Sequence, residues 1–158
     1  MPSNHETFMA IAIEEAKAGA KMGEQPFGAV VVRNGEVVVA SRSLKVSTSD
    51  TTAHSETLAI KLATQKLGMR RIPDATFYAT CEPCPMCLGA ILNAGIGTLV
   101  LGARNTDIQQ LATLAFNFKD YSVENFAEMV GWDLTVVNDV LREECVNLYR
   151  SATVELTR

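Results

Sequence analysis

Two short stretches of the chain carry residue types that bind metals. The stretch ATCEPCPMCLGAIL contains Cys81, Cys84 and Cys87, and the stretch AHSET contains His54 and Glu56. Imidazole nitrogen and thiolate sulfur are ligands that Zn²⁺ prefers, and three protein ligands leave a fourth position for water, as in catalytic rather than structural zinc sites. The residue types therefore predict a metal centre that acts on a water molecule.

The cysteines can be read as two overlapping Cys-x-x-Cys pairs, Cys81 with Cys84 or Cys84 with Cys87. Pro85 is typical of the first turn of a helix, and residues three apart share one helix face, so Cys84 and Cys87 can close on one ion. Exposed N–H groups at the start of a helix also favour anionic thiolates. The helix pattern thus favours the second pair.

Glu56 follows His54 by two residues in the start of another predicted helix. A carboxylate near the metal can take a proton from water and return it to a leaving group. A lone His-x-Glu is a weak signal, and a lone Cys-x-x-Cys in a cytosolic protein can be a redox pair. Both motifs together, each at the start of a helix, indicate metal-assisted catalysis.

The hydrophobic pattern predicts elements that can position these motifs. Helices are predicted from Ser3, which with Glu6 forms a capping box, to about Gly23, and over 52–67, 85–94, 108–116 and 139–152, the last capped by Asn138 or Asp139. Strands are predicted on both sides of Asn34-Gly35 as a hairpin, and over 75–80, 97–103 and 134–138, with a loop between 116 and 134. Strands interleaved with helices after a hairpin predict an α/β fold, a three-layer α/β/α sandwich with a mixed central sheet.

Composition restricts the function classes. With 158 residues, 47% hydrophobic and 20% charged, the chain suits a single domain over residues 1–158. No apolar run approaches the ~20 residues of a membrane span, and no signal peptide is recognisable, so we expect a cytoplasmic protein without a membrane partner. Four cysteines there favour metal binding over disulfides, and a net charge of −4 argues against a large nucleic-acid interface.

The motifs resemble those of the zinc-dependent cytidine/nucleobase deaminase superfamily, with its His-x-Glu and Pro-Cys-x-x-Cys signature. The blocks QPFGAVVVRNGEVVVASR, DTTAHSETLAI, DATFYATCEPCPMCLGAI and IGTLVLGARN extend the resemblance over most of residues 4–104, closest to the guanine, cytosine and tRNA adenosine deaminase branch. The resemblance implies a cytidine deaminase-like fold, one zinc per chain and hydrolytic release of ammonia from an aromatic ring. It implies His54, Cys84 and Cys87 as ligands, Glu56 as proton shuttle and a homodimer.

The same resemblance suggests how the substrate is bound. Phe27 is a candidate stacking face or a core aromatic, Ala29 matches a position whose backbone approaches the base, and Gly28 permits close approach. The backbone N–H of Cys84 is a candidate for oxyanion-type support. Eleven positions before His54, relatives usually carry an asparagine that reads the base edge, whereas this chain has Ser43, so a neighbour such as Arg42 supplies the contact or the preferred ring differs. Ser55 stands where relatives usually have alanine.

Several substrates and one non-enzymatic class remain open. A free, guanine-like purine base is favoured by the cysteine at position 81 and by the acidic charge; the alternatives are adenosine-to-inosine editing in tRNA, for which LVLGARNTD speaks, and cytosine, pterin or triazine-like rings. A structural zinc module would need a fourth protein ligand, for which only Cys81 is plausible. We expect Cys81 to be a small buried hydrophobe, with a spare thiol for the site as the alternative, and Cys145 to lie in the core.

Overall fold

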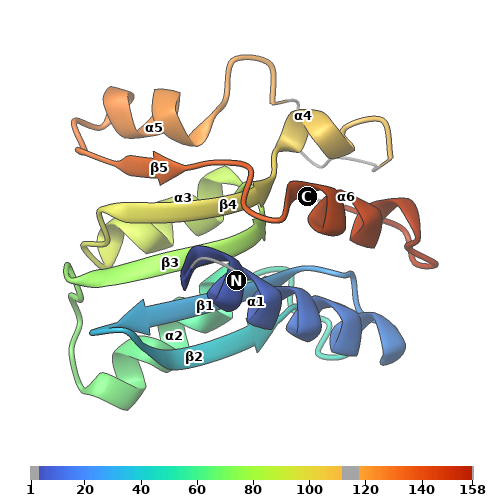
Figure 1. Cartoon of the computed structure of the whole chain (residues 1–158), viewed down its shortest axis with the longest axis horizontal. Coiled ribbons are helices and arrows are strands. Elements are labelled where there is room, and N and C mark those ends of the chain that lie inside the picture. The colour runs from blue at the N-terminus through green and yellow to red at the C-terminus, as the bar shows by residue number, and fades with distance from the viewer. Residues whose placement is uncertain (1–3, 112–117, 158) are drawn as a thin grey trace.

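Figure 1 shows the fold in a computed structural model of the protein, which describes residues 4–111 and 118–157. The strands are β1 (Gly28–Arg33), β2 (Glu36–Arg42), β3 (Ala75–Cys81), β4 (Thr98–Ala103) and β5 (Thr135–Val137). The helices are α1 (Asn4–Lys21), α2 (Ser55–Leu67), α3 (Pro85–Asn93), α4 (Asn105–Ile108), α5 (Val123–Met129) and α6 (Arg142–Arg150).

The strands in these ranges form one mixed sheet with the order β2-β1-β3-β4-β5. β1 runs antiparallel to both β2 and β3, whereas β3, β4 and β5 are parallel to one another. The hairpin between β1 and β2 turns at Asn34 and Gly35, which have φ of 53° and 75°. A two-residue turn with positive φ at both positions fits the twist of the strands, so the predicted hairpin is confirmed.

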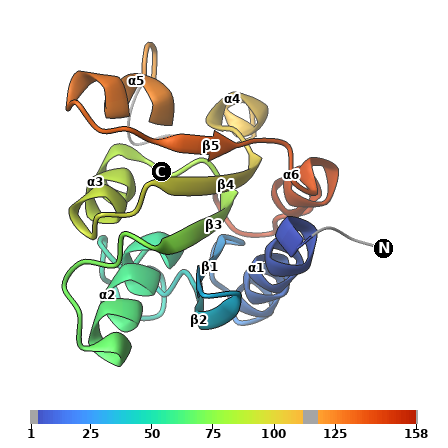
Figure 2. The same ribbon diagram turned by 60° about the vertical axis from the view of Figure 1, so that its left-hand side comes forward.

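Alternate strand residues divide the interior into two cores, one on each face of the sheet. Val30, Tyr78 and Val100 face α1 and α6, and their neighbours Val31, Phe77 and Leu99 face α2 and α3. This period of two is what a sheet covered on both faces requires. Figure 2 shows the three layers, with α2 and α3 on one side of the sheet and α1 and α6 on the other, so the predicted α/β/α sandwich is confirmed.

Gly28 lets α1 cross the start of β1 at close range. A Cβ on Gly28 would lie 1.9 Å from the carbonyl oxygen of Ala12 and 3.0 Å from the backbone nitrogen of Ala16, both in α1. The sequence suggested that this glycine admits the substrate. The structure shows that it admits the helix backbone.

We expect Gly28→Ala to lower the free energy of unfolding by about 3 kcal/mol, because the new methyl group overlaps main-chain atoms that cannot rotate away. Urea denaturation of the purified variant measures the change. Gly89→Ala is the control, because a Cβ at Gly89, in α3, meets no heavy atom within 4 Å. Alanine in a helix is favoured over glycine by about 1 kcal/mol, so an unstable Gly89→Ala protein would contradict this interpretation.

The predictions for residues 105–130 were largely wrong. The expected helix over 108–116 is replaced, in its described part, by the shorter α4, which starts at Asn105, and by a turn over 109–111. Asp107 closes this helix start by accepting from the backbone N–H of Arg104 at 2.8 Å. α5 lies where a loop was expected and begins at Ser122, whose hydroxyl accepts from the N–H of Asn125.

α6 begins later than predicted, and neither Asn138 nor Asp139 caps it. Leu141 is its N-cap, and both Asp139 and Leu141 have left-handed backbone, with φ of 61° and 51°. The N–H of Val140 donates to the carbonyl of Leu101 in β4, which holds this turn against the sheet and delays the helix until Arg142.

Two sequence predictions concern segments that the structure does not describe. Ser3, the expected cap of the first helix, lies outside the described residues, as does all of the apolar stretch 113–118 except Phe118. That stretch was considered for the expected dimer interface, and the dimer stays a prediction. Among the helices in the described ranges, none combines the length and apolar character needed to cross a bilayer.

Candidate metal centre and active site

The three expected metal ligands lie at the amino ends of two neighbouring helices. His54 is the N-cap of α2, directly before the helix rather than within its first turns as predicted, and Cys84 is the N-cap of α3. Both have extended backbone, with ψ of 156° and 169°. Cys87 lies in the first turn of α3, so the positive ends of both helices face the side chains and favour anionic thiolates.

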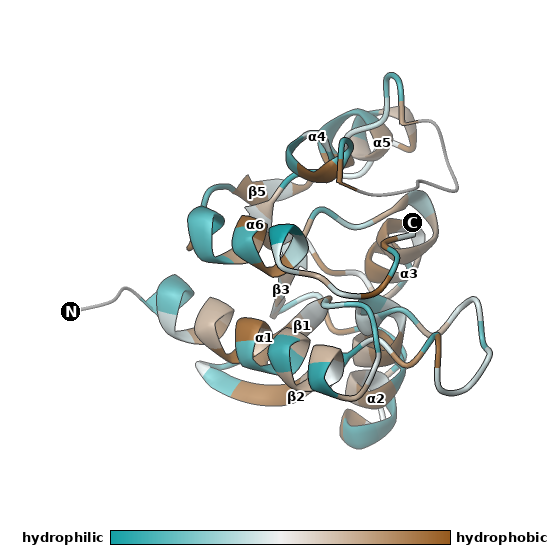
Figure 3. Ribbon diagram, turned by 90° about the vertical axis from the view of Figure 1, so that its right-hand side faces the viewer, coloured by the Kyte–Doolittle hydropathy of each residue, from teal (hydrophilic) through white to brown (hydrophobic). Residues whose placement is uncertain are grey.

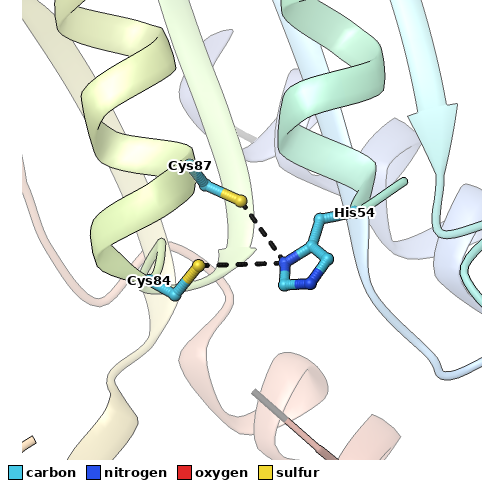
Figure 4. Close-up of side chains that lie close together, drawn as sticks. All are labelled: His54, Cys84 and Cys87. Atoms are coloured by element: carbon cyan, nitrogen blue, oxygen red, sulfur yellow. Dashed lines mark hydrogen bonds between the residues drawn. The ribbon is translucent and has the colours of Figure 1, made fainter. Parts of the chain in front are cut away.

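The side chains converge on one point (Figure 4). His54 Nδ1 lies 3.4 Å from Cys87 Sγ and 3.8 Å from Cys84 Sγ, and the donor atoms of all three residues lie within 4.8 Å of one another. Tetrahedral Zn²⁺ with its usual bond lengths separates a nitrogen and a sulfur ligand by about 3.5 Å. The spacing and the donor set therefore fit a zinc ion held by three protein ligands.

The other two cysteines belong to the core. Cys81, 1% exposed, packs between the sheet and the α1/α6 layer, and its thiol donates to Asn105 Oδ1 at 3.9 Å. In the described part of the chain it is not a member of the metal-binding group. Cys145 is fully buried in α6, and burial raises the pKa of its thiol to about 12. Both positions match the expectation of small buried side chains.

Glu56 is a buried carboxylate in the first turn of α2, only 1% exposed. The hydroxyl of the adjacent Ser55 donates to Glu56 Oε1 at 2.5 Å. A hydrogen bond to an ionised group is stronger than one between neutral groups, so Ser55 fixes one carboxylate oxygen. The serine that departs from the family pattern therefore orients the candidate proton shuttle.

We expect Ser55→Ala to lower kcat about tenfold without loss of zinc, because the carboxylate loses its fixed orientation. Steady-state kinetics together with metal analysis of the variant test this. Ser41→Ala is the matched control, since Ser41 is also buried but lies on β2, away from the metal-binding group. An unchanged kcat in Ser55→Ala would show that Glu56 does not need this donor.

A small pocket adjoins the metal-binding group. It is lined by Gln25, Phe27, Ser43, Lys45, His54, Ser55 and Thr157. Its volume of about 10 Å³ is room for about one water molecule. Two of the predicted substrate-binding residues, Phe27 and Ser43, line this pocket, and Phe27 also packs on Tyr149 with ring centroids 5.1 Å apart.

The other two predicted contacts lie elsewhere. Ala29 is fully buried in β1, in the core that faces α2 and α3, and does not line the pocket. Arg42, considered as a replacement for the missing asparagine, pairs with Glu15 at 2.8 Å on the α1 side and does not reach the pocket. Ser43 itself accepts a long hydrogen bond of 3.4 Å from the backbone N–H of Lys45.

Three pocket residues were missed by the sequence analysis, namely Gln25, Lys45 and Thr157. Gln25 is only two residues before Phe27, and Lys45 only two after Ser43. Their closeness to predicted contacts was the available signal for these two. Nothing in the sequence links Thr157, near the end of the chain, to the metal motifs.

Glu82 anchors the loop that carries Cys84. Its carboxylate accepts from the backbone N–H groups of Asn105 and Val123 at 3.1 and 3.0 Å and from Arg104 Nη1 at 3.1 Å. Tyr121 adds a hydrogen bond from its hydroxyl to the carbonyl of Pro83. The turn before α3 is therefore tied to the end of β4 and to the start of α5.

Glu24 anchors the loop that leads to His54. Its buried carboxylate accepts from the backbone N–H groups of Val46 and Ser47, at 3.0 and 2.7 Å. Burial opposes ionisation, but the hydrogen bonds from Ser47 and Val46 outweigh it and lower the pKa of Glu24. Both ligand-bearing segments are thus fixed by buried carboxylates outside the two motifs.

The comparison with protein families settles the family. The model of the MafB19-like deaminases matches residues 3–143. The chain belongs to this family. The resemblance to the zinc-dependent nucleobase deaminases is thereby confirmed, together with the fold that it implied.

This MafB19-like deaminase has well-characterised relatives of two kinds. It is 36% identical to the tRNA-specific adenosine deaminase of Bacillus subtilis over 97% of its own length and 91% of the relative. It is 41% identical to the guanine deaminase of the same organism over 66% of its length and 67% of the relative. The solved guanine deaminase from Nitrosomonas europaea superposes with a TM-score of 0.82 at 26% identity, covering 96% and 85% of the two chains.

These relatives confirm the prediction of a hydrolytic deaminase at the level of nucleobase or nucleoside. Their names favour the tRNA alternative over the guanine-like base that the sequence analysis preferred. The zinc ion, the ligand set and the role of Glu56 stay predictions of the MafB19-like deaminase, and they are taken up as proposals below.

Proposed function

We propose that this chain is a zinc-dependent hydrolytic deaminase of a purine base. The observation that carries the proposal is the convergence of His54, Cys84 and Cys87, at distances that suit one tetrahedral ion, beside a pocket that a planar ring can enter. Zinc held there would supply Lewis-acid activation of a water molecule.

Glu56 is the proposed proton carrier. Its carboxylate takes a proton from the attacking water and passes it to the ring nitrogen next to the amine-bearing carbon. The water oxygen bonds to that carbon, the C–N bond breaks, and the amine leaves as ammonia with a second proton from Glu56. Ser55 holds Oε1 of this carboxylate in place, and the backbone N–H of Cys84 is the proposed donor to the developing oxyanion.

A free base of the guanine type is our first candidate substrate. The pocket is closed on one side by Thr157, so it is suited to a small ring rather than to an open nucleic-acid strand. The net charge of −4 also disfavours a polyanion. Phe27, at 4% exposure, offers an aromatic wall to a planar ring, with Ser43 beside it.

Adenosine in tRNA is the second candidate. It is supported by the nearly full-length similarity to the tRNA-specific adenosine deaminase of B. subtilis. An enzyme of this kind binds RNA with a strong salt dependence, because each phosphate contact releases counterions.

Ammonia release separates the candidates. The zinc-loaded protein is assayed on guanine, adenine, cytosine, their nucleosides, and a tRNA anticodon stem-loop. Turnover of guanine supports the first candidate, and turnover of the stem-loop alone, lost as salt rises, supports the second. Zinc-loaded protein that releases no ammonia from any of these substrates would overturn the proposed function.

A further inference from the structure

Gln25 holds the end of the chain through both atoms of its amide. Its Nε2 donates to Thr157 Oγ1 at 2.9 Å, and its Oε1 accepts from the backbone N–H of Thr157 at 3.0 Å. Since a backbone N–H can only donate, the amide oxygen must face it and the NH₂ must face the hydroxyl. Gln25 is 5% exposed and lines the pocket beside His54, so this donor–acceptor pair is fixed at the candidate active site.

Lys45 donates to the same oxygen. Its Nζ lies 3.1 Å from Thr157 Oγ1, which therefore receives two donors, one from Gln25 and one from Lys45. A carbonyl oxygen has two lone pairs and suits this position, and a neighbouring N–H suits Gln25 Oε1. Thr157 thus presents the polar pattern of a lactam, an N–H next to a C=O, in the place where the pocket is closed. The segment that follows α6 leads to this end of the chain (Figure 3).

We propose that Gln25 and Lys45 are the specificity-determining residues of this site, that they read a lactam edge of the substrate ring, and that Thr157 occupies their hydrogen bonds until the substrate displaces it. The proposal rests on the proposed function, since it assigns the substrate class of the same site. The Gln25 amide thereby provides the donor and acceptor that a serine at position 43 lacks.

The lactam pattern discriminates between purines. In guanine, the N–H and C=O lie on the ring edge next to the carbon that carries the amine. Adenine within RNA has no carbonyl, and its amine must face the catalytic centre, so it leaves both donors and Gln25 Oε1 without matching partners. Unmatched buried polar groups are what makes a hydrogen-bonding site reject an analogue strongly. Thr157 also lies beyond residue 143, where the match to the family model ends.

Binding of a non-reactive lactam tests the proposal. Hypoxanthine carries the N–H and C=O but no amine, and unsubstituted purine lacks both, so calorimetry with the zinc-loaded protein compares the two rings without turnover. We expect hypoxanthine to bind at least about tenfold more tightly than purine. Gln25→Ala and Lys45→Met should each reduce this ratio about tenfold, whereas Gln65→Ala and Lys61→Met, exposed on α2, should not change it.

Thr157→Val gives a result of opposite sign. It removes the oxygen that competes for both donors, so hypoxanthine should bind severalfold more tightly than to the unaltered protein. A weaker affinity in Thr157→Val, or an unchanged ratio in Gln25→Ala and Lys45→Met, would overturn the proposal. Ammonia release from the same preparations keeps the two hypotheses apart: turnover without lactam preference rejects the role of Gln25 and Lys45, and lactam preference without turnover of any base rejects the deaminase function.

Discussion

Glu56→Gln is expected to lower kcat by about 10²–10⁴-fold, the usual contribution of a positioned general acid and base. Glutamine preserves the shape of the side chain and can still accept from Ser55, which donates to Oε1 in the unaltered protein. It cannot take up a proton at neutral pH, so proton transfer to the ring and to the leaving amine is lost. KM should change little, because the pocket walls are intact.

Zinc content makes this result specific. The proposed ligands are His54, Cys84 and Cys87, so Glu56→Gln should retain one zinc per chain and unfold at nearly the same temperature as the unaltered protein. Glu128→Gln, an exposed carboxylate on α5, serves as the matched control and should keep full activity. If Glu56→Gln retained more than a tenth of kcat on the best substrate, the proton shuttle would have to be another group.

The parts of the fold that the sequence predicted correctly depend on local chemistry. Asn34 and Gly35 tolerate positive φ, so the hairpin is readable from two residues. Pro85 after Cys84 marks the start of α3, and helical spacing then brings Cys87 back to the side of Cys84. The candidate ligand set could be predicted because each half of it is encoded within four residues.

The supports of the site could not be predicted, because they join residues far apart in the chain. Glu82 reaches Val123, and Gln25 reaches Thr157, through contacts that no local spacing encodes. The same limit explains α5 and the late start of α6. The turn before α6 is set by a hydrogen bond from Val140 to Leu101 in β4, and not by the capping preference of Asn138 or Asp139.

Cys87→Ser is expected to weaken zinc binding by more than about 100-fold, because even the loss of a partner that only orients a ligand costs 10–100-fold. Cys87 Sγ is the sulfur closest to His54 Nδ1, at 3.4 Å, and a serine hydroxyl is a poor zinc ligand at neutral pH. Zinc that binds only the folded chain stabilises it by mass action, so the variant should also melt at a lower temperature. Metal analysis after dialysis against a weak chelator, followed by calorimetry with and without added zinc, measures both effects.

Cys81→Ser separates the two overlapping cysteine pairs. Its thiol contacts Asn105 in the core rather than His54, so this variant should lose stability but keep one zinc per chain and kcat. Cys84→Ser and Cys87→Ser should instead lose zinc and activity together, with unaltered protein stripped of metal giving the same loss. Retention of zinc in Cys87→Ser, together with its loss in Cys81→Ser, would assign the metal to the first pair and require a rearranged turn before α3. The helix start at Pro85 opposes that arrangement, because it directs Cys84 and Cys87 to one side, toward His54.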